Sequence, residues 1–381
     1  MKYTLSYWEK EFSRTERDII IIGGGIVGLQ TAINIKAFSP KLDVLVVDKG
    51  QGKFSASTKN AGFACFGSPT ELLADIETVG PETAMNTVHQ RWKGLQRMKD
   101  TLPAASICFQ QHGGYEIFLK GEEQIYQKVL DKVDFLNAEI QQVTGLATTF
   151  SPDDGQLSQM GFQDVPYLIY NPYEGQLHPA LMIQGLTAKA LAAGVTIANG
   201  VSIKQILPLE QKVELIDNEG NKLKATSVVV ATNGFTQQLF PQLDLYPVRN
   251  QVLITEEIHS LPFKGTFHYH EGYVYFRNVG KRVLIGGGRH LDKEGEQTDS
   301  FGEHHDILIY LENFLANHLL PEQPIRIHHK WSGILGMGKE KEPLLEFVYP
   351  NVLAAVRLGG MGVALGWEVG SKAASLIVER H

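Results

Sequence analysis

The residues that most clearly predict chemistry are three glycines with G-x-G-x-x-G spacing, Gly23, Gly25 and Gly28. Such a turn lets a pyrophosphate approach the backbone, and the helix that follows presents free N–H groups to an anion. Asp48 lies twenty residues beyond Gly28. A carboxylate there can accept hydrogen bonds from a ribose diol and would repel a 2′-phosphate. The spacing predicts a dinucleotide site but does not choose between dinucleotides.

The elements that must position this turn are predicted on both sides of it. Residues 18–22 form a short apolar run rich in β-branched residues, which is typical of a buried parallel strand. Residues 29–38 have helical character, and residues 42–48 predict a second buried strand. The glycine turn therefore has the strand, helix and second strand that a nucleotide-binding unit requires.

The rest of the chain interleaves similar elements with other segments. Helices are expected at 81–101, 122–138 and 180–193, and the last strand and helix at 352–356 and 368–379. The predicted fold class is α/β, a Rossmann-type domain with a mixed, largely antiparallel substrate-binding sheet. Both domains are expected to be discontinuous, the first comprising residues 15–79, 178–238 and 331–381, and the second residues 80–177 and 239–330.

Composition narrows the functional classes. The 381 residues carry a formal net charge of -7 and no block of like charge, so we expect no nucleic-acid partner. No apolar run reaches the roughly 18 residues that span a membrane, and the N-terminus does not resemble a signal peptide. A cytoplasmic protein without integral membrane association is expected. Cys65 and Cys108 are too few for a metal cluster, and the adjacent pairs His304–His305 and His328–His329 are poor chelators, so no metal is expected.

Several segments resemble the D-amino-acid oxidase (DAO) family of flavoproteins, which includes glycine oxidase, sarcosine oxidase and gamma-glutamylputrescine oxidase. Residues 55–62 (SASTKNAG) resemble its G-A-S-x-R-N-x-G segment, with Lys59 in place of the usual Arg. Residues 176–179, 229–234, 247–252 and 356–366 resemble its H-P turn, A-T-G strand end, P-x-R-G-Q segment and C-terminal glycine turn, with Met361 replacing His. The order of these motifs favours FAD over NAD.

The resemblance implies FAD, bound without a covalent link, and a set of cofactor contacts. The glycine turn and the following helix start would hold the pyrophosphate, and the N–H groups after Gly360 would face the flavin pyrimidine carbonyls. The predicted cofactor-binding residues are Gly23, Gly25, Ile26, Val27, Gly28, Asp48, Lys49, Ser57, Thr58, Lys59, Asn60, Gly62, Phe63, Ile203, Ala231, Thr232, Gly234, Gly333, Gly360, Met361, Gly362, Val363 and Ala364.

Four residues are candidates for substrate chemistry. By strand alternation Tyr275 and Arg277 share one face, which could line a pocket or be an ordinary solvated face. Arg357 precedes the C-terminal turn, where it could contact substrate or pair with a buried carboxylate. Lys59 could shift the reduction potential of the flavin or take part in oxygen activation. It could also contact the pyrophosphate or form a structural salt bridge. Leu335 stands where the family often has a carboxylate-binding Arg, which argues against simple glycine-oxidase activity.

These features predict an FAD-dependent oxidoreductase that oxidises the C–N bond of a small amine or amino acid by hydride transfer to flavin N5. Its electron acceptor would be O2 or another compound. Two alternatives stay open: an FAD enzyme of the same fold that acts on a 2-hydroxy acid or another substrate, and a non-catalytic flavin-binding protein.

Overall fold

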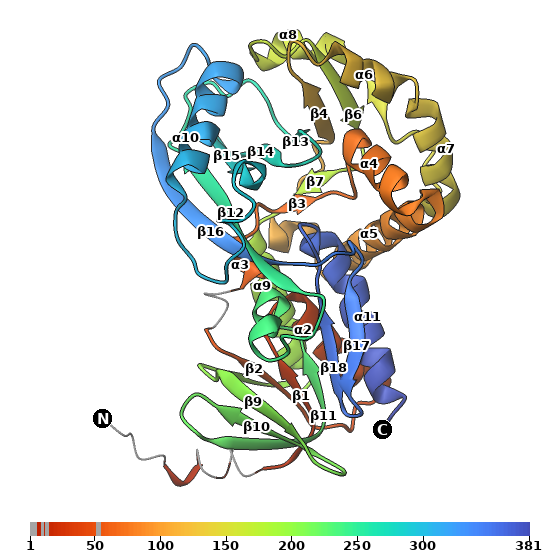
Figure 1. The fold of residues 1–381 in the computed structure, drawn as a ribbon, viewed down its shortest axis with the longest axis vertical. Coiled ribbons are helices and arrows are strands. Elements are labelled where there is room, and N and C mark those ends of the chain that lie inside the picture. The colour runs from red at the N-terminus through yellow and green to blue at the C-terminus, as the bar shows by residue number, and fades with distance from the viewer. Residues whose placement is uncertain (1–5, 9–10, 12–14, 51–54) are drawn as a thin grey trace. The chain divides into compact units, whose positions relative to one another are not determined.

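The structure is a computed structural model that describes residues 6–8, 11, 15–50 and 55–381 (Figure 1). The chain divides into two compact units, which we describe separately. Unit 1 comprises Met1–Thr58, Ala180–Pro247 and Leu335–His381, and unit 2 comprises Lys59–Pro179 and Val248–Ile334. Residues 59–79, which the sequence analysis assigned to the nucleotide domain, cluster with unit 2, and residues 239–247 cluster with unit 1.

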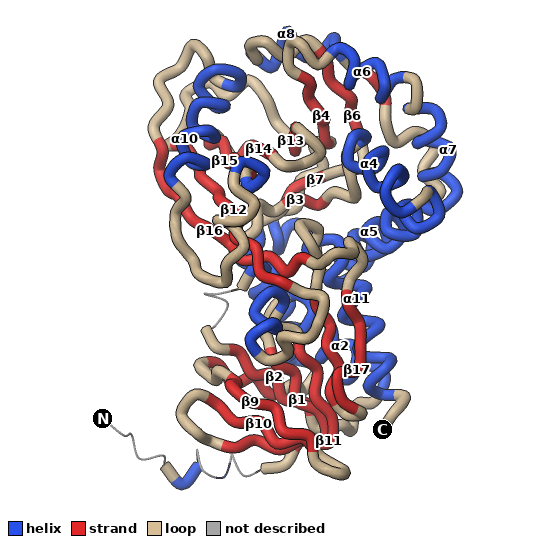
Figure 2. Tube along the Cα trace, viewed as in Figure 1, coloured by secondary structure: helices blue, strands red, loops and turns tan. Residues whose placement is uncertain are grey.

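Unit 1 is built on a sheet whose strands run in the order β17-β18-β11-β1-β2-β8, with a β9–β10 ribbon joined to β11 (Figure 2). The five strands from β18 to β8 are parallel, whereas β17 is antiparallel to β18. The bounds are β1 (Arg17–Ile22), β2 (Val44–Asp48), β8 (Thr196–Asn199), β9 (Ile203–Pro208), β10 (Val213–Asp217), β11 (Lys222–Val230), β17 (Leu344–Tyr349) and β18 (Val352–Val356).

The parallel strands of unit 1 are covered on both faces, which explains their continuous apolar sequences. Ile20 and Ile22 of β1 pack with Val213 and Leu215 of the ribbon. Helices α2 (Ile26–Phe38) and α11 (Gly362–Val378) pack against each other. Helix α2 also packs against β1 and β2, and helix α11 also packs against β18. Helix α9 (Pro179–Ala192) precedes β8 along the chain.

Unit 2 contains a largely antiparallel sheet in the order β16-β12-β15-β14-β13-β4-β6-β5, in which only β13 and β4 pair in parallel among the pairs described. The bounds are β4 (Gly114–Phe118), β5 (Ser151–Pro152), β6 (Tyr167–Asn171), β12 (Tyr246–Thr255), β13 (Thr266–Tyr269), β14 (Val274–Val279), β15 (Arg282–Gly287) and β16 (Ile327–Met337). A small second sheet pairs β3 (Phe63–Ala64) with β7 (Gly175–Gln176).

An aromatic core supports this sheet. Phe267 and Phe276, cross-strand partners of β13 and β14, stack with ring centroids 4.6 Å apart, and Phe314 of α10 (His305–Phe314) packs in the same cluster. The remaining α-helices are α3 (Ala56–Lys59), α4 (Pro69–Val79), α5 (Pro81–Thr101), α6 (Glu123–Leu130), α7 (Val133–Thr144) and α8 (Leu157–Met160). Short 3-10 turns lie at Ala104–Ile107, Asp154–Gln156, Asn233–Gln238 and Arg289–Leu291, and a π turn at Leu315–Leu319.

Most predicted elements are confirmed, and three differ informatively. The helix expected at 122–138 is two helices, α6 and α7, because the chain turns at residues 131–132 and the second helix continues to Thr144. The last helix begins at Gly362 rather than 368, so the glycine turn itself opens it. The Gly, Ser, Ala and Asn content of residues 51–69 predicts a loop, but residues 56–59 form α3 and residues 63–64 form β3. Residues 51–54 lie outside the described part.

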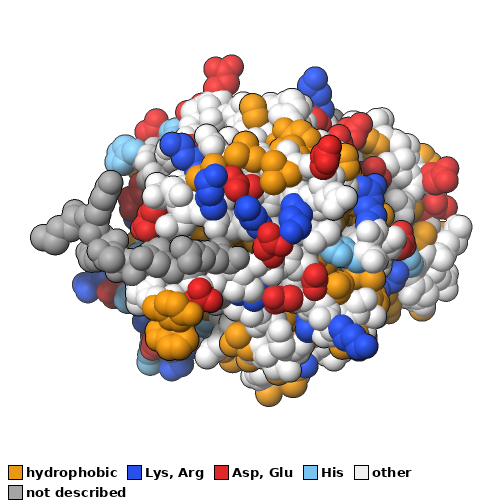
Figure 3. All heavy atoms as spheres, turned by 90° about the horizontal axis from the view of Figure 1, so that it is seen from below, with side chains coloured by type: hydrophobic (Ala, Val, Ile, Leu, Met, Phe, Trp, Pro, Cys, Tyr) orange, Lys and Arg blue, Asp and Glu red, His pale blue; other side chains and the backbone are white. Residues whose placement is uncertain are grey.

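The surface agrees with the charge pattern of the sequence. On the face drawn in Figure 3, acidic and basic side chains are interspersed and neither sign dominates. Among the described residues, no helix is both long and apolar enough to cross a membrane.

Candidate functional site

The glycine turn of unit 1 has a backbone that only glycine fits. Gly23 has a φ of 114°, and a Cβ there would lie 2.6 Å from the carbonyl oxygen of Ala231. A Cβ on Gly28 would lie 1.8 Å from the carbonyl oxygen of Gly23. At Gly25, which caps α2 without a side-chain hydrogen bond, a Cβ would lie 2.8 Å from Ser57 Oγ. These contacts explain the glycine spacing through packing of the turn on its neighbours.

The first turn of α2 offers hydrogen-bond donors. The N–H of Ile26 donates to Ser57 Oγ at 3.0 Å. Within the described chain, the N–H groups of Val27 and Gly28 have no acceptor, although both residues are buried. Unpaired buried donors are costly unless a ligand satisfies them, and a helix N-terminus favours an anion. The residues present therefore fit a pyrophosphate.

Asp48 connects the end of β2 to this turn. Its Oδ2 accepts the N–H of Gly24 at 2.9 Å, and its Oδ1 accepts the N–H of Gly50 at 2.8 Å. The exposed Lys49 ammonium lies 3.4 Å from the ring centroid of Phe235.

The other predicted cofactor residues of unit 1 lie on three segments. Thr232 Oγ1 and Thr236 Oγ1 are 2.7 Å apart after β11, and a Cβ on Gly234 would lie 2.5 Å from the carbonyl oxygen of Leu335. Ile203 starts β9 and is partly buried, while Thr58 Oγ1 donates to the Ser55 carbonyl at 3.2 Å.

The C-terminal turn has the same donor pattern as the first. Met361 is the N-cap of α11, and its carbonyl accepts the N–H groups of Ala364 and Leu365. In the described part of the molecule, the N–H groups of Gly362 and Val363 have no acceptor. A Cβ on Gly360 would meet nothing within 4 Å, so space is open beside these donors.

Unit 2 holds the predicted residues that follow Thr58. The Gly62 N–H donates to Asn60 Oδ1 at 2.8 Å, and with a φ of 75° a Cβ on Gly62 would lie 2.3 Å from the Leu177 carbonyl oxygen. Trp331 Nε1 donates to the Lys59 carbonyl at 2.9 Å, and a Cβ on Gly333 would lie 3.4 Å from Lys59 Cβ.

Within the part of the chain that the structure describes, the side chain of Lys59 makes no salt bridge. Its ammonium lies 5.0 Å from the ring centroid of Phe301, and no acidic partner is found for it among the described residues. The structure thus offers no support for the salt-bridge alternative. The expected place of Lys59 beside the flavin stays a prediction.

Arg277 is buried and is held by backbone carbonyls. Its Nε donates to Ala61, its Nη1 to Asn278 at 3.2 Å and its Nη2 to Leu177 at 3.1 Å. Burial lowers the pKa of Arg277 to about 10. The face that it shares with Tyr275 is therefore not an ordinary solvated one. The guanidinium ties the Lys59–Gly62 loop and the residue before the H-P turn to β14.

Arg357 lies in unit 1, whereas Arg277 and Tyr275 lie in unit 2. Its Nη1 contacts Asp244 Oδ2 at 2.7 Å, its Nη2 lies 3.5 Å from Glu340 Oε2, and its Nε donates to the Glu342 carbonyl. Arg357 is thus paired with carboxylates, but these are not buried ones, since the side chains of Asp244 and Glu340 are 35% and 77% exposed. Contact with substrate stays a prediction.

Tyr275 has neighbours that the sequence analysis did not select. Its hydroxyl accepts Asn250 Nδ2 at 2.9 Å, and its ring lies 5.4 Å from that of Phe63. Burial raises the pKa of Tyr275, and the charge of Arg289 opposes this increase. Arg289 lies 4.9 Å from the ring centroid of Tyr273 and, among the described residues, has no acidic partner. The sequence signal that could have identified Arg289 was its position directly after the run of glycines at the end of β15.

Known proteins resemble this chain along most of its length. Residues 18–376 match the DAO family, described as "FAD dependent oxidoreductase". A protein named "Probable oxidoreductase OrdL" from Rhizobium meliloti is 25% identical over 364 residues, which cover 91% of this chain and 80% of that protein.

Two solved structures share its fold. L-proline dehydrogenase from P. horikoshii has a TM-score of 0.77 at 17% identity, with 96% of this chain and 94% of that chain covered. Glycine oxidase from Bacillus cereus ATCC 14579 has a TM-score of 0.72 at 18% identity, with 96% of each chain covered.

Proposed function

Because the chain belongs to the DAO family of FAD-dependent oxidoreductases, we propose that it oxidises the C–N bond of an amino acid or another small amine. FAD, when bound, supplies the acceptor for the hydride that leaves the carbon bearing the nitrogen. The names of structural neighbours support this substrate class, since an L-proline dehydrogenase and a glycine oxidase are among the solved structures that share the fold.

The observation that carries the cofactor assignment is the pair of helix starts with free donors in unit 1. We assign the N–H groups of Val27 and Gly28 to the pyrophosphate and those of Gly362 and Val363 to the flavin pyrimidine carbonyls. The first pair would bind a permanent anion, and the second would stabilise negative charge near the pyrimidine ring.

For the substrate we propose Arg289 and Tyr275 as the groups that bind a carboxylate. Arg289 is a partly buried guanidinium with no acidic partner in the described chain, and its charge acts on the Tyr275 hydroxyl. A guanidinium fork orients a carboxylate through two parallel hydrogen bonds, which fixes the direction of the neighbouring C–H bond. Arg277 holds this face in place from the side of the Lys59–Gly62 loop.

Anaerobic reduction of the flavin tests the proposed reaction. Purified protein with bound FAD is mixed with amino acids, simple amines and 2-hydroxy acids, and bleaching of the visible flavin spectrum is recorded. We expect bleaching by at least one amine or amino acid. Bleaching by 2-hydroxy acids alone would show that the C–N assignment is wrong, and no bleaching by any compound would favour the non-catalytic alternative.

Arg289→Met tests the substrate assignment. Loss of a charge-assisted pair should lower kcat/KM for carboxylate-bearing substrates by about 10- to 150-fold, which corresponds to roughly 1.5–3 kcal/mol. Amines without a carboxylate should be affected much less. Arg326→Met, at an exposed position of the same unit, is the matched control. An equal loss with both kinds of substrate would remove Arg289 from carboxylate binding.

A further inference from the structure

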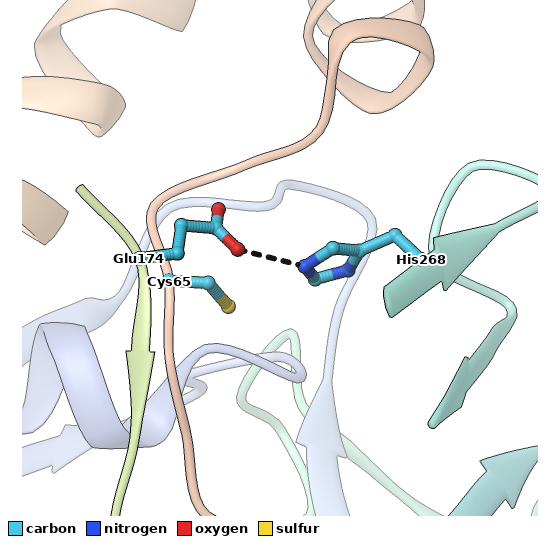
Figure 4. A group of neighbouring side chains, drawn as sticks. All are labelled: Cys65, Glu174 and His268. Carbon is cyan, nitrogen blue, oxygen red and sulfur yellow. Dashed lines mark hydrogen bonds and ion pairs between the residues drawn. The ribbon is translucent and has the colours of Figure 1, made fainter. Parts of the chain in front are cut away.

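Three buried side chains of unit 2 converge at a point that neither the sequence motifs nor the proposed function uses. Cys65 follows β3, Glu174 precedes β7, and His268 lies on β13. Pairing of Ala64 with Gly175 brings Cys65 next to Glu174. The thiol, a carboxylate oxygen and an imidazole nitrogen all lie within 4.8 Å of one another, as Figure 4 shows.

The three side chains are almost completely removed from solvent. Cys65 is 4% exposed, Glu174 1% and His268 7%. His268 Nε2 lies 3.0 Å from Glu174 Oε2. A second carboxylate, Glu116, is also buried and acts electrostatically on His268. The cluster thus combines a carboxylate, a thiol and an imidazole, all groups that bind a cation, and Glu116 adds a second negative charge that acts on it.

Two of the three groups would have to lose a proton to bind a metal. Burial raises the pKa of Cys65 well above its usual value, and Glu174 adds to this increase, so without a metal the thiol stays neutral. Burial by itself lowers the pKa of His268, but Glu174 and Glu116 more than offset it, and the net pKa is raised. A bound metal would take thiolate and neutral imidazole instead.

We propose that Cys65, Glu174 and His268 bind one Zn²⁺ ion. Sulfur, imidazole nitrogen and carboxylate oxygen are the three ligand types that zinc accepts in proteins. Binding would release one proton from the Cys65 thiol and one from the His268 imidazolium. The thiolate and the Glu174 carboxylate then balance the two charges of the metal, and a water molecule completes a tetrahedral set.

The distances are compatible with this coordination after small side-chain movements. Tetrahedral zinc with ordinary bond lengths places sulfur and nitrogen ligands roughly 3.6 Å apart and nitrogen and oxygen ligands roughly 3.4 Å apart. The distance between His268 Nε2 and Glu174 Oε2, now 3.0 Å, would increase slightly. The Cys65 sulfur, which lies within 4.8 Å of a ligand atom of each of the other two residues, would move toward them. Rotation of the Cys65 side chain is the movement required.

The surroundings orient the Glu174 ligand. Thr266 Oγ1 donates to its Oε2 at 3.3 Å, and Asn171 Nδ2 donates to its Oε1 at 3.4 Å. Ligating groups in metal sites are held by such outer hydrogen bonds. The His268 ring also packs edge-on against Phe63 with centroids 5.4 Å apart, so a bound metal would order a neighbour of Tyr275.

Metal analysis of the FAD-bound protein tests the proposal. Protein expressed with added zinc sulfate and desalted in the presence of EDTA should retain about one zinc per chain by mass spectrometry. Cys65→Ser and His268→Gln should retain less than about a tenth of that amount. Cys108→Ser, which removes the exposed second thiol, should retain it in full. Visible flavin absorption and circular dichroism establish that each variant is folded.

A second measurement does not depend on substitutions in the core. Cobalt bound in place of zinc should give thiolate-to-cobalt charge-transfer bands. It should also give ligand-field bands, which lie at wavelengths longer than flavin absorption. Wild-type protein that retains no zinc after growth with zinc, and shows no cobalt bands after loading, would overturn the proposal. Retention of zinc in both Cys65→Ser and His268→Gln would overturn it as well, because the metal would then lie elsewhere.

Discussion

At the scale of single residues, the arginines of this protein differ in what engages them. Arg277 donates to three backbone carbonyls and contacts no carboxylate among the described residues. Arg357 is engaged by Asp244 and Glu340, whereas Arg289 has no acidic partner in the described chain. A guanidinium that already satisfies structural acceptors positions a site, and an unpaired one is available for a ligand.

Arg277→Met should destabilise the protein without removing a ligand contact. The carbonyls of Ala61 and Leu177 would each lose a donor in a buried setting, at about 1–3 kcal/mol per group. Urea unfolding should show that the free energy of unfolding falls by roughly 3 kcal/mol in total. Arg277→Lys should lose less, because lysine keeps the positive charge although it lacks the planar guanidinium fork. Exposed Arg326→Met should change the free energy of unfolding by under about 0.5 kcal/mol. Equal stability of Arg277→Met and wild type would contradict this role.

Glu116 should make the protein less stable as the pH rises. Burial raises its pKa to about 7, against hydrogen bonds from Thr70 and Ser68 and the charge of His268, which lower it. A carboxyl whose folded pKa exceeds its unfolded value contributes stability that is complete below about pH 4.5 and is lost as the pH rises through 7.

Urea unfolding between pH 4.5 and 8 measures this effect. The shift corresponds to about 3 kcal/mol, and Glu116→Gln should remove that part of the pH dependence. The exposed Glu303→Gln should retain the wild-type slope. If Glu116→Gln and wild type lost stability in parallel across this range, the buried carboxyl would not be the source.

At the scale of elements, two helices of unit 1 begin without a side-chain cap. Helix α2 begins after Gly25 and helix α11 begins after Met361. Within the described structure, the first N–H groups of both helices have no acceptor. The exception is the N–H of Ile26, which donates to Ser57 Oγ. The other α-helices whose N-caps are described also lack a side-chain cap, so the position of these two starts is what distinguishes them. Each follows a strand of the parallel sheet, α2 after β1 and α11 after β18, where a dinucleotide is expected to bind.

Gly25→Ala should reduce FAD binding. Its Cβ would lie 2.8 Å from Ser57 Oγ, so the serine must move away from the Ile26 N–H and the α2 start changes shape. We expect the dissociation constant for FAD to rise at least about tenfold, which corresponds to about 1.4 kcal/mol. FAD titration followed by flavin fluorescence measures it. Gly155→Ala, whose Cβ would meet only Asp153 at 3.9 Å, is the control, and unchanged affinity in Gly25→Ala would contradict the assignment.

At the scale of the whole molecule, the two units share one chain that passes between them four times. Unit 1 takes three segments and unit 2 takes two. The neighbours of β1 in the sheet, β2 and β11, come from different segments of the sequence, and β18 is added from a third. Neither unit is therefore a contiguous piece of the chain.

A fragment of residues 1–179 should not fold on its own. It keeps β1 and β2 but lacks β11, β18 and α11, so the β1 edge and the apolar face of α2 lose their partners. We expect weak far-ultraviolet circular dichroism, no cooperative urea transition and no FAD retention, whereas the full chain shows all three signals. A cooperative transition in the fragment would show that the units are less interdependent than the topology indicates.

The nucleotide-binding part of this protein was readable from its sequence because its determinants are local. The spacing of Gly23, Gly25 and Gly28 marks one turn between a strand and the next helix, although only the close contact of Gly28 with Gly23 lies within that turn. The apolar runs beside the turn record burial on both faces of a parallel sheet. The order of the motifs also identified the family. The break between α6 and α7 was missed because both halves keep helical periodicity across residues 131–132.

Only the tertiary structure decided what each isolated charge or thiol contacts. Arg277 and Arg357 could not be told apart by type or by neighbours in sequence. Apart from Asn278, which follows Arg277, the hydrogen-bond partners named for them lie 15 to 216 residues away along the chain. Cys65, Glu174 and His268 are separated by about a hundred residues each, so no local spacing signals a metal site. Strand pairing brings such residues together, and strand pairing is a property of the folded chain.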